Sequence, residues 1–184
     1  MDARPPLPPV ERVLAVDPSL RGTGYAILER AQGAGARGST VLRALTWGVI
    51  RNPPALLHTG CLVAIHEKVR DLVAEFSPTA AAFEAVIFVQ SYKTAIVLGC
   101  ARGAALLAAA GSGLPIFEYA PRRVKQAVVG RGGAEKAQVA FMVRALLGLT
   151  ETPEADAADA LAVGLTHFQA VDRAKLGVAP LERI

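Results

Sequence analysis

The sequence contains little cysteine and little histidine, with two and three residues respectively. Cys61 and Cys100 fall in predicted helices and have no partner at the spacing of a metal site. We therefore expect two free thiols in a reducing cytoplasm. The three histidines are scattered along the chain, which excludes a zinc site built from histidine and cysteine. No uninterrupted run of about 18 apolar residues is present, so the sequence predicts no membrane span.

The first ten positions also lack the hydrophobic residues of a signal sequence and are rich in proline instead. We expect residues 1–10 to be a disordered lead-in, residues 11–170 to form one domain, and residues 171–184 to be a weakly structured tail. Charged residues make up 20% of the chain and apolar residues 52%. This composition is typical of a globular protein and unlike that of a disordered one.

Five short segments have the composition of β-strands. The first is Arg12–Asp17, an apolar run that ends in Asp-Pro, and the others are Tyr25–Glu29, Val41–Ile50, Ala80–Ala85 and Leu114–Tyr119. The first three strands follow one another, whereas the last two alternate with helices. This order predicts an α/β fold in which a mixed five-stranded sheet is flanked by helices.

Helices are predicted where apolar residues recur at spacings of three and four. The first four cover Leu57 to Phe76, residues 90–110, residues 121–130 and residues 134–147. The last helix is predicted to have Thr152 as its N-cap, to begin at Pro153 and to end at about Gln169. In the second of these helices, Gly99 and Gly103 lie one turn apart. Their spacing permits the close approach of another element of the chain or of another subunit.

Positive charge is concentrated in one part of the sequence, although the net charge is only +4. Between Phe117 and Arg144 only Glu118 and Glu135 oppose the cations Arg122, Arg123, Lys125, Arg131, Lys136 and Arg144. Such a stretch fits a surface that faces the phosphates of a nucleic acid. On charge alone, a solvated helix face explains it equally well.

Asp156 and Asp159 lie three residues apart in the last predicted helix and therefore share a face, with Val163 one turn further on. Two carboxylates that lie close together and partly buried repel each other unless a cation compensates them. The alternative is that both are acids of the first helical turn, favoured by the helix dipole and facing water.

The positions of Asp17 and Glu84 favour the first interpretation, in which a bound cation compensates the carboxylates. Asp17 ends a buried strand, and Glu84 is embedded in an apolar strand, positions at which a carboxylate adds no stability. If the two strands are parallel neighbours, both acids emerge at the same end of the sheet. Four carboxylates gathered there would suit Mg²⁺ or Mn²⁺, and such a cluster is typical of two-metal phosphodiester hydrolysis.

Lys136 lies in the first turn of a predicted helix that follows a glycine-rich segment, where exposed amide donors can hold a phosphate oxygen. Lys125 lies on the preceding helix. A plain surface cation is the alternative for each lysine, and the glycines make Lys136 the better phosphate ligand.

In these features the chain resembles the RuvC family of Holliday-junction resolvases, which have a ribonuclease H-like fold. The similarity extends from about Arg12 to Phe168. It rests on several motifs that occur in order and at similar spacing: Val16–Tyr25, Phe83-Glu84, Leu98–Gly103, Tyr119–Gln126, Gly130–Val139 and Ala155–Leu161.

The resemblance implies a homodimer that binds four-way DNA junctions, works with a branch-migration complex and nicks two strands symmetrically. It places the catalytic, metal-binding acids on Asp17, Glu84, Asp156 and Asp159, with two Mg²⁺ ions per site for which Mn²⁺ can substitute. It places DNA-contacting cations on Lys125 and Lys136, and the dimer helix on the segment with Gly99 and Gly103. The products implied are 5′-phosphate and 3′-hydroxyl ends. Arg122 and Arg131 are further candidates for DNA contact.

Two positions depart from the family pattern. Ser19 stands where the family usually has glycine after Asp-Pro, and Ile87 stands where it has an aromatic residue that stacks on DNA. Phe88, the next residue, either takes over the stacking or belongs to the core.

Two other functions deserve comparison with the nuclease. The segment from Asp17 to Thr23-Gly24 is similar to the phosphate loop of actin-like and sugar-kinase ATPases, but 184 residues leave no room for their second lobe. A non-catalytic DNA-binding paralogue is the other alternative, and the presence of all four acids argues against it.

Overall fold

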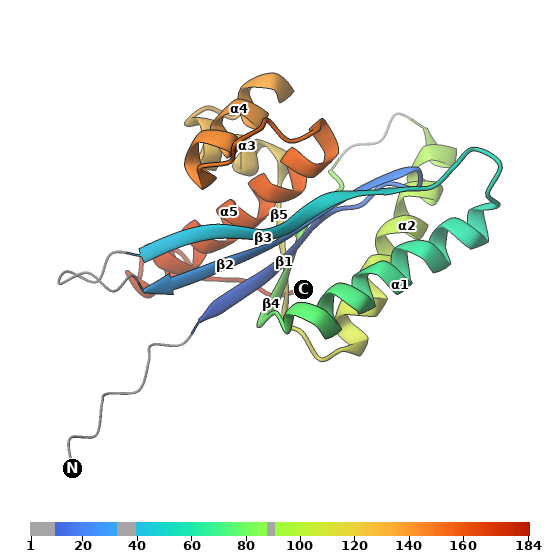
Figure 1. Cartoon of the computed structure of the whole chain (residues 1–184), viewed down its shortest axis with the longest axis horizontal. Helices are drawn as coiled ribbons and strands as arrows, with labels where there is room; N and C mark the ends of the chain where they lie inside the picture. The colour runs from blue at the N-terminus through green and yellow to red at the C-terminus, as the bar shows by residue number, and fades with distance from the viewer. Residues whose placement is uncertain (1–9, 33–39, 88–90) are drawn as a thin grey trace, which may run out of the picture.

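The computed structural model describes residues 10–32, 40–87 and 91–184 (Figure 1). Phe88 lies outside these residues, as does almost all of the proline-rich segment 1–10. The described residues form, in chain order, the elements β1 (Glu11–Asp17), β2 (Gly22–Gln32), β3 (Thr40–Arg51), α1 (His58–Phe76), β4 (Ala80–Glu84), α2 (Tyr92–Gly111), β5 (Ile116–Tyr119), α3 (Pro121–Val129), α4 (Lys136–Leu147) and α5 (Ala155–Lys175).

The strands form one mixed sheet in the order β3-β2-β1-β4-β5. β1, β2 and β3 pair antiparallel, whereas β4 runs parallel to both β1 and β5. This arrangement confirms the predicted α/β fold with a mixed five-stranded sheet, including the parallel pairing of the two strands that carry Asp17 and Glu84.

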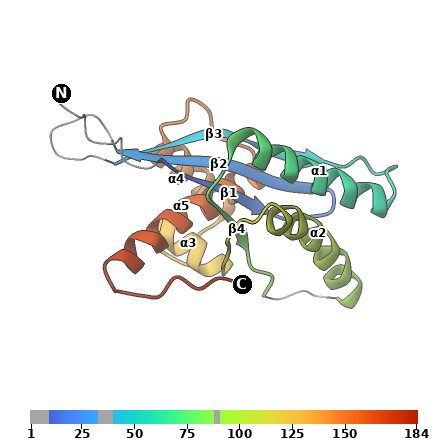
Figure 2. The same cartoon turned by 90° about the horizontal axis from the view of Figure 1, so that it is seen from below.

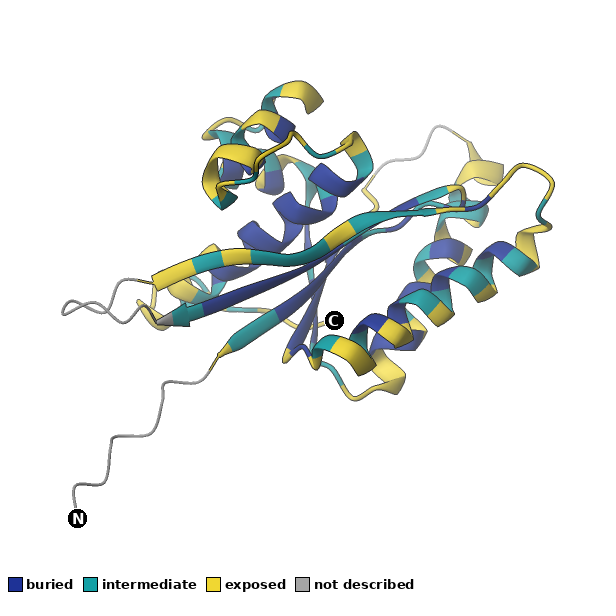
Figure 3. Ribbon diagram, viewed as in Figure 1, coloured by how far each residue is buried: buried dark blue, intermediate teal, exposed yellow. Residues whose placement is uncertain are grey.

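Helices cover both faces of the sheet, with α1 and α2 on one side and α3, α4 and α5 on the other (Figures 1 and 2). Because side chains alternate along a strand, β1 contributes to two cores. Leu14 and Val16 pack with α1 and α2, and Val13 and Ala15 pack with α5. Figure 3 shows the resulting buried band along β1 and α5. Burial on both sides fixes the register of β1, and with it the position of its last residue, Asp17.

The last helix differs from its prediction at both ends. Glu154, rather than Thr152, is the N-cap residue of α5, and the helix begins at Ala155. The hydroxyl of Thr152 is in contact with the Arg144 guanidinium instead of a helical N–H group. At the other end α5 continues to Lys175, because Phe168 and Ala170 still pack into the core. Residues 171–175 are therefore helical, and only the residues that follow lack helix or strand.

α2 is the most apolar of the described helices that lie on the surface. By length and composition alone it is apolar enough to cross a membrane, although Lys93 and Arg102 interrupt its apolar residues. Only 22% of its most apolar 18-residue stretch is buried inside the chain. Arg102 pairs with Glu118, whereas Ile96 and Leu107 are exposed. Much of this helix therefore presents apolar surface outward.

Candidate active site

Asp17 and Glu84 lie side by side at the carboxyl ends of two parallel strands. The preceding residues, Val16 and Phe83, are register partners in the β1–β4 ladder. Both preceding side chains are fully buried. Their burial anchors the ends of the strands, so the two carboxylates project from a fixed edge of the sheet and lie close enough to affect each other's pKa.

Asp156 is brought to this edge by the glycines of β2. Gly24 is the register partner of Asp17, and a Cβ at Gly24 would overlap the backbone carbonyl oxygen of Asp156. A Cβ at Gly22 would come within 2.8 Å of the Asp156 Oδ2 atom. The first turn of α5 therefore rests directly on the β2 backbone, and only glycine permits this approach. The sequence did not reveal this role of Gly22 and Gly24, because it depends on a contact with α5, which is distant along the chain.

Asp159 lies one turn further along α5 and is mostly buried, with 19% of its side chain exposed. Val163 follows on the same face and is fully buried. This packing rules out two acids that simply face water. The dipole argument still holds for Asp156, which is in the first helical turn.

Burial and the neighbouring acids raise the pKa of two of the four carboxyls, those of Asp17 and Glu84. Burial, followed by the neighbouring charges of Glu84 and Asp159, raises the pKa of Asp17 to about 8. Burial and then the charge of Asp159 raise the pKa of Glu84. Asp156 adds to the effect on Asp17. The raised pKa values of Asp17 and Glu84 indicate a site with a deficit of positive charge.

Two lysines partly supply that charge. Lys136 donates a hydrogen bond from Nζ to Asp159 Oδ2 at 2.8 Å, and this bond raises the pKa of the lysine. The charge of Lys136 also offsets part of the rise in the pKa of Asp17, and the charge of Lys125 offsets part of the rise in the pKa of Glu84. Lys136 is therefore in direct contact with the acids, and Lys125 lies near enough for its charge to act on Glu84. The other predicted cations differ in position: Arg122 lines the pocket beside the acids, whereas Arg131 donates a hydrogen bond to Gln138 on α4.

A pocket of about 350 Å³ opens beside Asp17 and Glu84. Its remaining wall is largely apolar and is formed by Pro18, Ala85, Val86, Ile87, Leu98, Pro121 and Arg122. Ile87 is 66% exposed at this wall. The candidate stacking residue Phe88 lies outside the described residues. The other family departure, Ser19, is accommodated in a closed turn, because the buried Thr23 hydroxyl accepts a hydrogen bond from the Ser19 N–H group.

The donor set fits a hard divalent cation by its chemistry, because all four side chains are carboxylates, which Mg²⁺ and Mn²⁺ prefer. The raised pKa of Asp17 agrees with a site that lacks a positive charge. Among the described residues, however, no three acidic, histidine or cysteine side chains are arranged closely enough to hold a metal ion. Asp159 is instead turned to the Lys136 ammonium group.

Known proteins resemble this chain in both sequence and fold. The family model for crossover junction endodeoxyribonuclease RuvC matches residues 13–167. The RuvC of Akkermansia muciniphila is 51% identical over 164 residues, which cover 89% of this chain and 94% of that protein. The chain belongs to the RuvC family. The RuvC of Edwardsiella ictaluri is 46% identical over 155 residues, covering 84% of this chain and 85% of its relative.

The RuvC fold is shared as well. A structure of T. thermophilus RuvC in complex with a Holliday junction substrate superposes with a TM-score of 0.79 at 34% sequence identity, covering 95% of this chain and 99% of the other. The resemblance inferred from the motifs is thereby confirmed, and so is the ribonuclease H-like fold. Membership of the RuvC family makes this chain a nuclease of the crossover-junction class and removes the ATPase alternative.

Proposed function

We propose that this chain resolves four-way DNA junctions by nicking two strands symmetrically, with Asp17, Glu84, Asp156 and Asp159 as its catalytic acids. The observation that carries the proposal is the convergence of β1, β4 and the first turn of α5, which brings four mutually repelling carboxylates to one edge of the sheet. The junction-bound RuvC structure supports the choice of substrate.

The acids would hold two Mg²⁺ ions, with Mn²⁺ as a substitute. Such ions would lower the pKa of the attacking water and stabilise charge on the leaving 3′ oxygen, giving 5′-phosphate and 3′-hydroxyl ends. The protein itself would position the carboxylate oxygens and set the pKa values of these groups. Because the pKa of the Asp17 carboxyl is raised to about 8, this group would release a proton when a metal ion binds. Lys136 occupies Asp159 until then, as an internal counter-ion.

Cations beside the acids would position the DNA backbone. Lys136 pairs with Asp159 and the charge of Lys125 acts on Glu84, so a phosphate held by either lysine would lie near the site of cleavage. Arg122 extends this positive edge along α3, and Arg131 provides a more distant phosphate contact. Phosphate contacts fix the register of a protein on DNA without reading its sequence. Phe88 would stack on a base at the junction, following the exposed Ile87.

A homodimer would form through α2. Its outward surface exposes Tyr92, Ile96 and Leu107, and a Cβ at Gly99 or Gly103 would have no atom within 4 Å. Within the described residues these two glycines therefore serve no close contact inside the chain, which favours the subunit contact over the intramolecular one. A second copy would cover the apolar surface. It would also supply the second active site that symmetric nicking requires.

The enzyme would act in the cytoplasm together with a branch-migration complex, as the resemblance implies. The primary test is cleavage of a synthetic four-way junction and of a linear duplex of the same sequence, with Mg²⁺ present. We expect cutting of the junction only, and paired nicks that a ligase seals. Asp156→Asn should abolish cutting and retain junction binding, whereas Glu151→Gln, at an exposed acid just before α5, should leave cutting unchanged.

Each other outcome has a distinct meaning. Equal cutting of the duplex would refute junction selectivity. Binding without any cutting by the wild-type protein, at every Mg²⁺ and Mn²⁺ concentration, would favour a non-catalytic paralogue. Full cutting by Asp156→Asn would remove that residue from the proposed acid cluster.

A further inference from the structure

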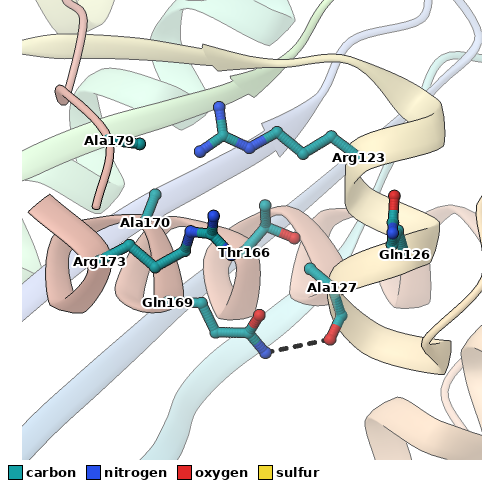
Figure 4. A pocket seen from close by; sticks show the side chains of 8 residues that line it. All are labelled: Arg123, Gln126, Ala127, Thr166, Gln169, Ala170, Arg173 and Ala179. Carbon is teal, nitrogen blue, oxygen red and sulfur yellow. Dashed lines mark hydrogen bonds between the residues drawn. The ribbon is translucent and has the colours of Figure 1, made fainter.

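A second cavity, lined by several polar side chains, lies away from the acids, between α3, the carboxyl-terminal half of α5 and the segment that follows α5. Its volume is about 430 Å³, within the range of small-molecule sites. Figure 4 shows its lining, which consists of Arg123, Gln126, Ala127, Thr166, Gln169, Ala170, Arg173 and Ala179. Two cations and two amides thus line the cavity, and none of its lining residues is acidic.

The two arginines are free to bind a ligand. In Figure 4 the side chains of Arg123 and Arg173 extend from α3 and α5 into the same space. Among the described residues neither guanidinium group has a salt-bridge or hydrogen-bond partner, although most other arginines do, such as Arg30 with Glu11 and Asp172. Two like charges that share a cavity repel each other, and an anion between them removes that repulsion.

The walls of the cavity are held in place by other contacts. Gln169 donates a hydrogen bond from Nε2 to the Ala127 carbonyl oxygen at 3.0 Å, which ties α5 to α3. The Arg123 guanidinium lies 5.1 Å from the centre of the Tyr119 ring, a contact that orients it. The segment after α5 is also fixed, because Leu181 packs against the core and the Ile184 N–H group donates to the Ile116 carbonyl oxygen. The site is therefore largely formed before any ligand arrives.

We propose that this cavity binds a phosphate group through Arg123 and Arg173. Guanidinium groups match the oxygen geometry of phosphate, and the amide of Gln126 adds a neutral donor that phosphate accepts from. The cavity is larger than a bare phosphate ion requires, so the group is carried by a larger molecule. Two carriers have this chemistry: a mononucleotide, and the backbone of bound DNA.

The position of the cavity is compatible with DNA that also occupies the acids. Along α5, Thr166 lies about 10 Å and Arg173 about 21 Å beyond Asp159, at roughly 1.5 Å per residue. A DNA strand advances about 3.4 Å per nucleotide, so a phosphate roughly three to six nucleotides from the cleavage site would reach the cavity. The DNA carrier rests on the proposed function, whereas the mononucleotide carrier does not.

Two variants and a matched control test the proposal. Arg123→Gln with Arg173→Gln removes both charges, and Gln126→Glu places a repelling carboxylate in the cavity. Lys68→Gln with Arg70→Gln removes the same net charge from α1, on the other side of the sheet. All of the altered side chains except Lys68 are exposed, and thermal unfolding checks that each variant folds.

In the first arm, 5′-dAMP is titrated into metal-free protein without DNA and the heat of binding is measured. We expect the double arginine variant and Gln126→Glu to bind at least tenfold more weakly than wild type, and the α1 control to bind as wild type does. In the second arm, junction binding is measured at several salt concentrations in EDTA. Loss of one backbone contact lowers the slope of log affinity against log salt by about 0.9.

Weaker dAMP binding with an unchanged slope identifies a nucleotide site, and a reduced slope identifies a DNA backbone site. Variants that match wild type in both arms overturn the proposal. The first arm uses neither metal nor DNA, so its result stands even if the wild-type protein fails to cut junctions. A failure of the proposed function is thus distinguished from a failure of this inference.

Discussion

Substitution of Asp17 by asparagine should stabilise the metal-free protein while abolishing its activity. The pKa of this carboxyl rises from 3.8 to about 8 on folding, first because of burial and then because of Glu84 and Asp159. The folded state therefore binds more protons than the unfolded state between these values. Stability falls as the pH rises through this window.

The magnitude follows from the pKa difference. Each pH unit between 3.8 and neutrality costs about 1.4 kcal/mol, which gives an upper limit of about 4 kcal/mol at pH 7. Remaining solvent contact and the interaction with Glu84 reduce this value, and we expect about 2 kcal/mol. For a chain of this length that corresponds to a rise in Tm of roughly 4–8 °C.

The assay is thermal unfolding of wild type and Asp17→Asn from pH 5 to pH 9, in EDTA and then with Mg²⁺. In EDTA the wild-type Tm should fall with rising pH more steeply than that of the variant. Mg²⁺ should raise the Tm of the wild type and have little effect on the variant. Asp71→Asn, at an exposed acid on α1, is the control. A variant no more stable than wild type in EDTA at pH 8 would refute the view that Asp17 sits among repelling carboxylates.

Three further predictions concern other parts of the chain. Gly24→Ala should displace the first turn of α5, because its Cβ overlaps the Asp156 carbonyl oxygen, and should reduce junction cutting more than tenfold while circular dichroism still shows a folded protein. Ile96→Glu should convert a dimer into monomers in sedimentation analysis, whereas Val63→Glu, at an exposed position on α1, should not. Burial, followed by the charge of Arg30, lowers the pKa of His167 to about 4, so this residue makes the wild type lose stability as the pH falls from 6.5 to 4. His167→Gln should lose less over that range in denaturant unfolding, and an unchanged pH dependence would exclude the role of His167.

Much of the fold was predictable because it depends on local pattern. The apolar run before Asp17 and the one around Glu84 indicate buried strands, and the structure shows them as parallel neighbours. The alternation of strands and helices after Phe76 likewise indicates the parallel part of the sheet. In these segments the burial pattern and the backbone preference agree, so the sequence alone predicts the elements to within a few residues.

Contacts between distant segments were not predictable from pattern. The ion pair between Lys136 and Asp159 depends on how α4 packs against α5, and no spacing in the sequence encodes that distance. The close contact of α5 with Gly24 likewise depends on how β2 and α5 pack together. The convergence of Arg123 and Arg173 depends on how α3 packs against α5.

A local sequence pattern also gave a wrong helix start where a side chain makes a different contact. Thr152 and Pro153 have the residue types of a helix start, yet the Arg144 guanidinium contacts the Thr152 hydroxyl and the helix begins at Ala155. For α2, its exposed apolar surface rather than its glycine spacing distinguishes a subunit contact from an internal one.

The central claim is that four carboxylates from two strand ends and one helix jointly hold divalent ions. A crystal structure of the wild-type protein soaked in Mn²⁺, analysed by anomalous scattering, tests it most directly. We predict two Mn²⁺ peaks between Asp17, Glu84, Asp156 and Asp159, each within about 2.0–2.3 Å of carboxylate oxygens, with the Lys136 ammonium group displaced from Asp159. A saturated soak with no peak among these oxygens, and with the Lys136–Asp159 pair intact, would contradict the account.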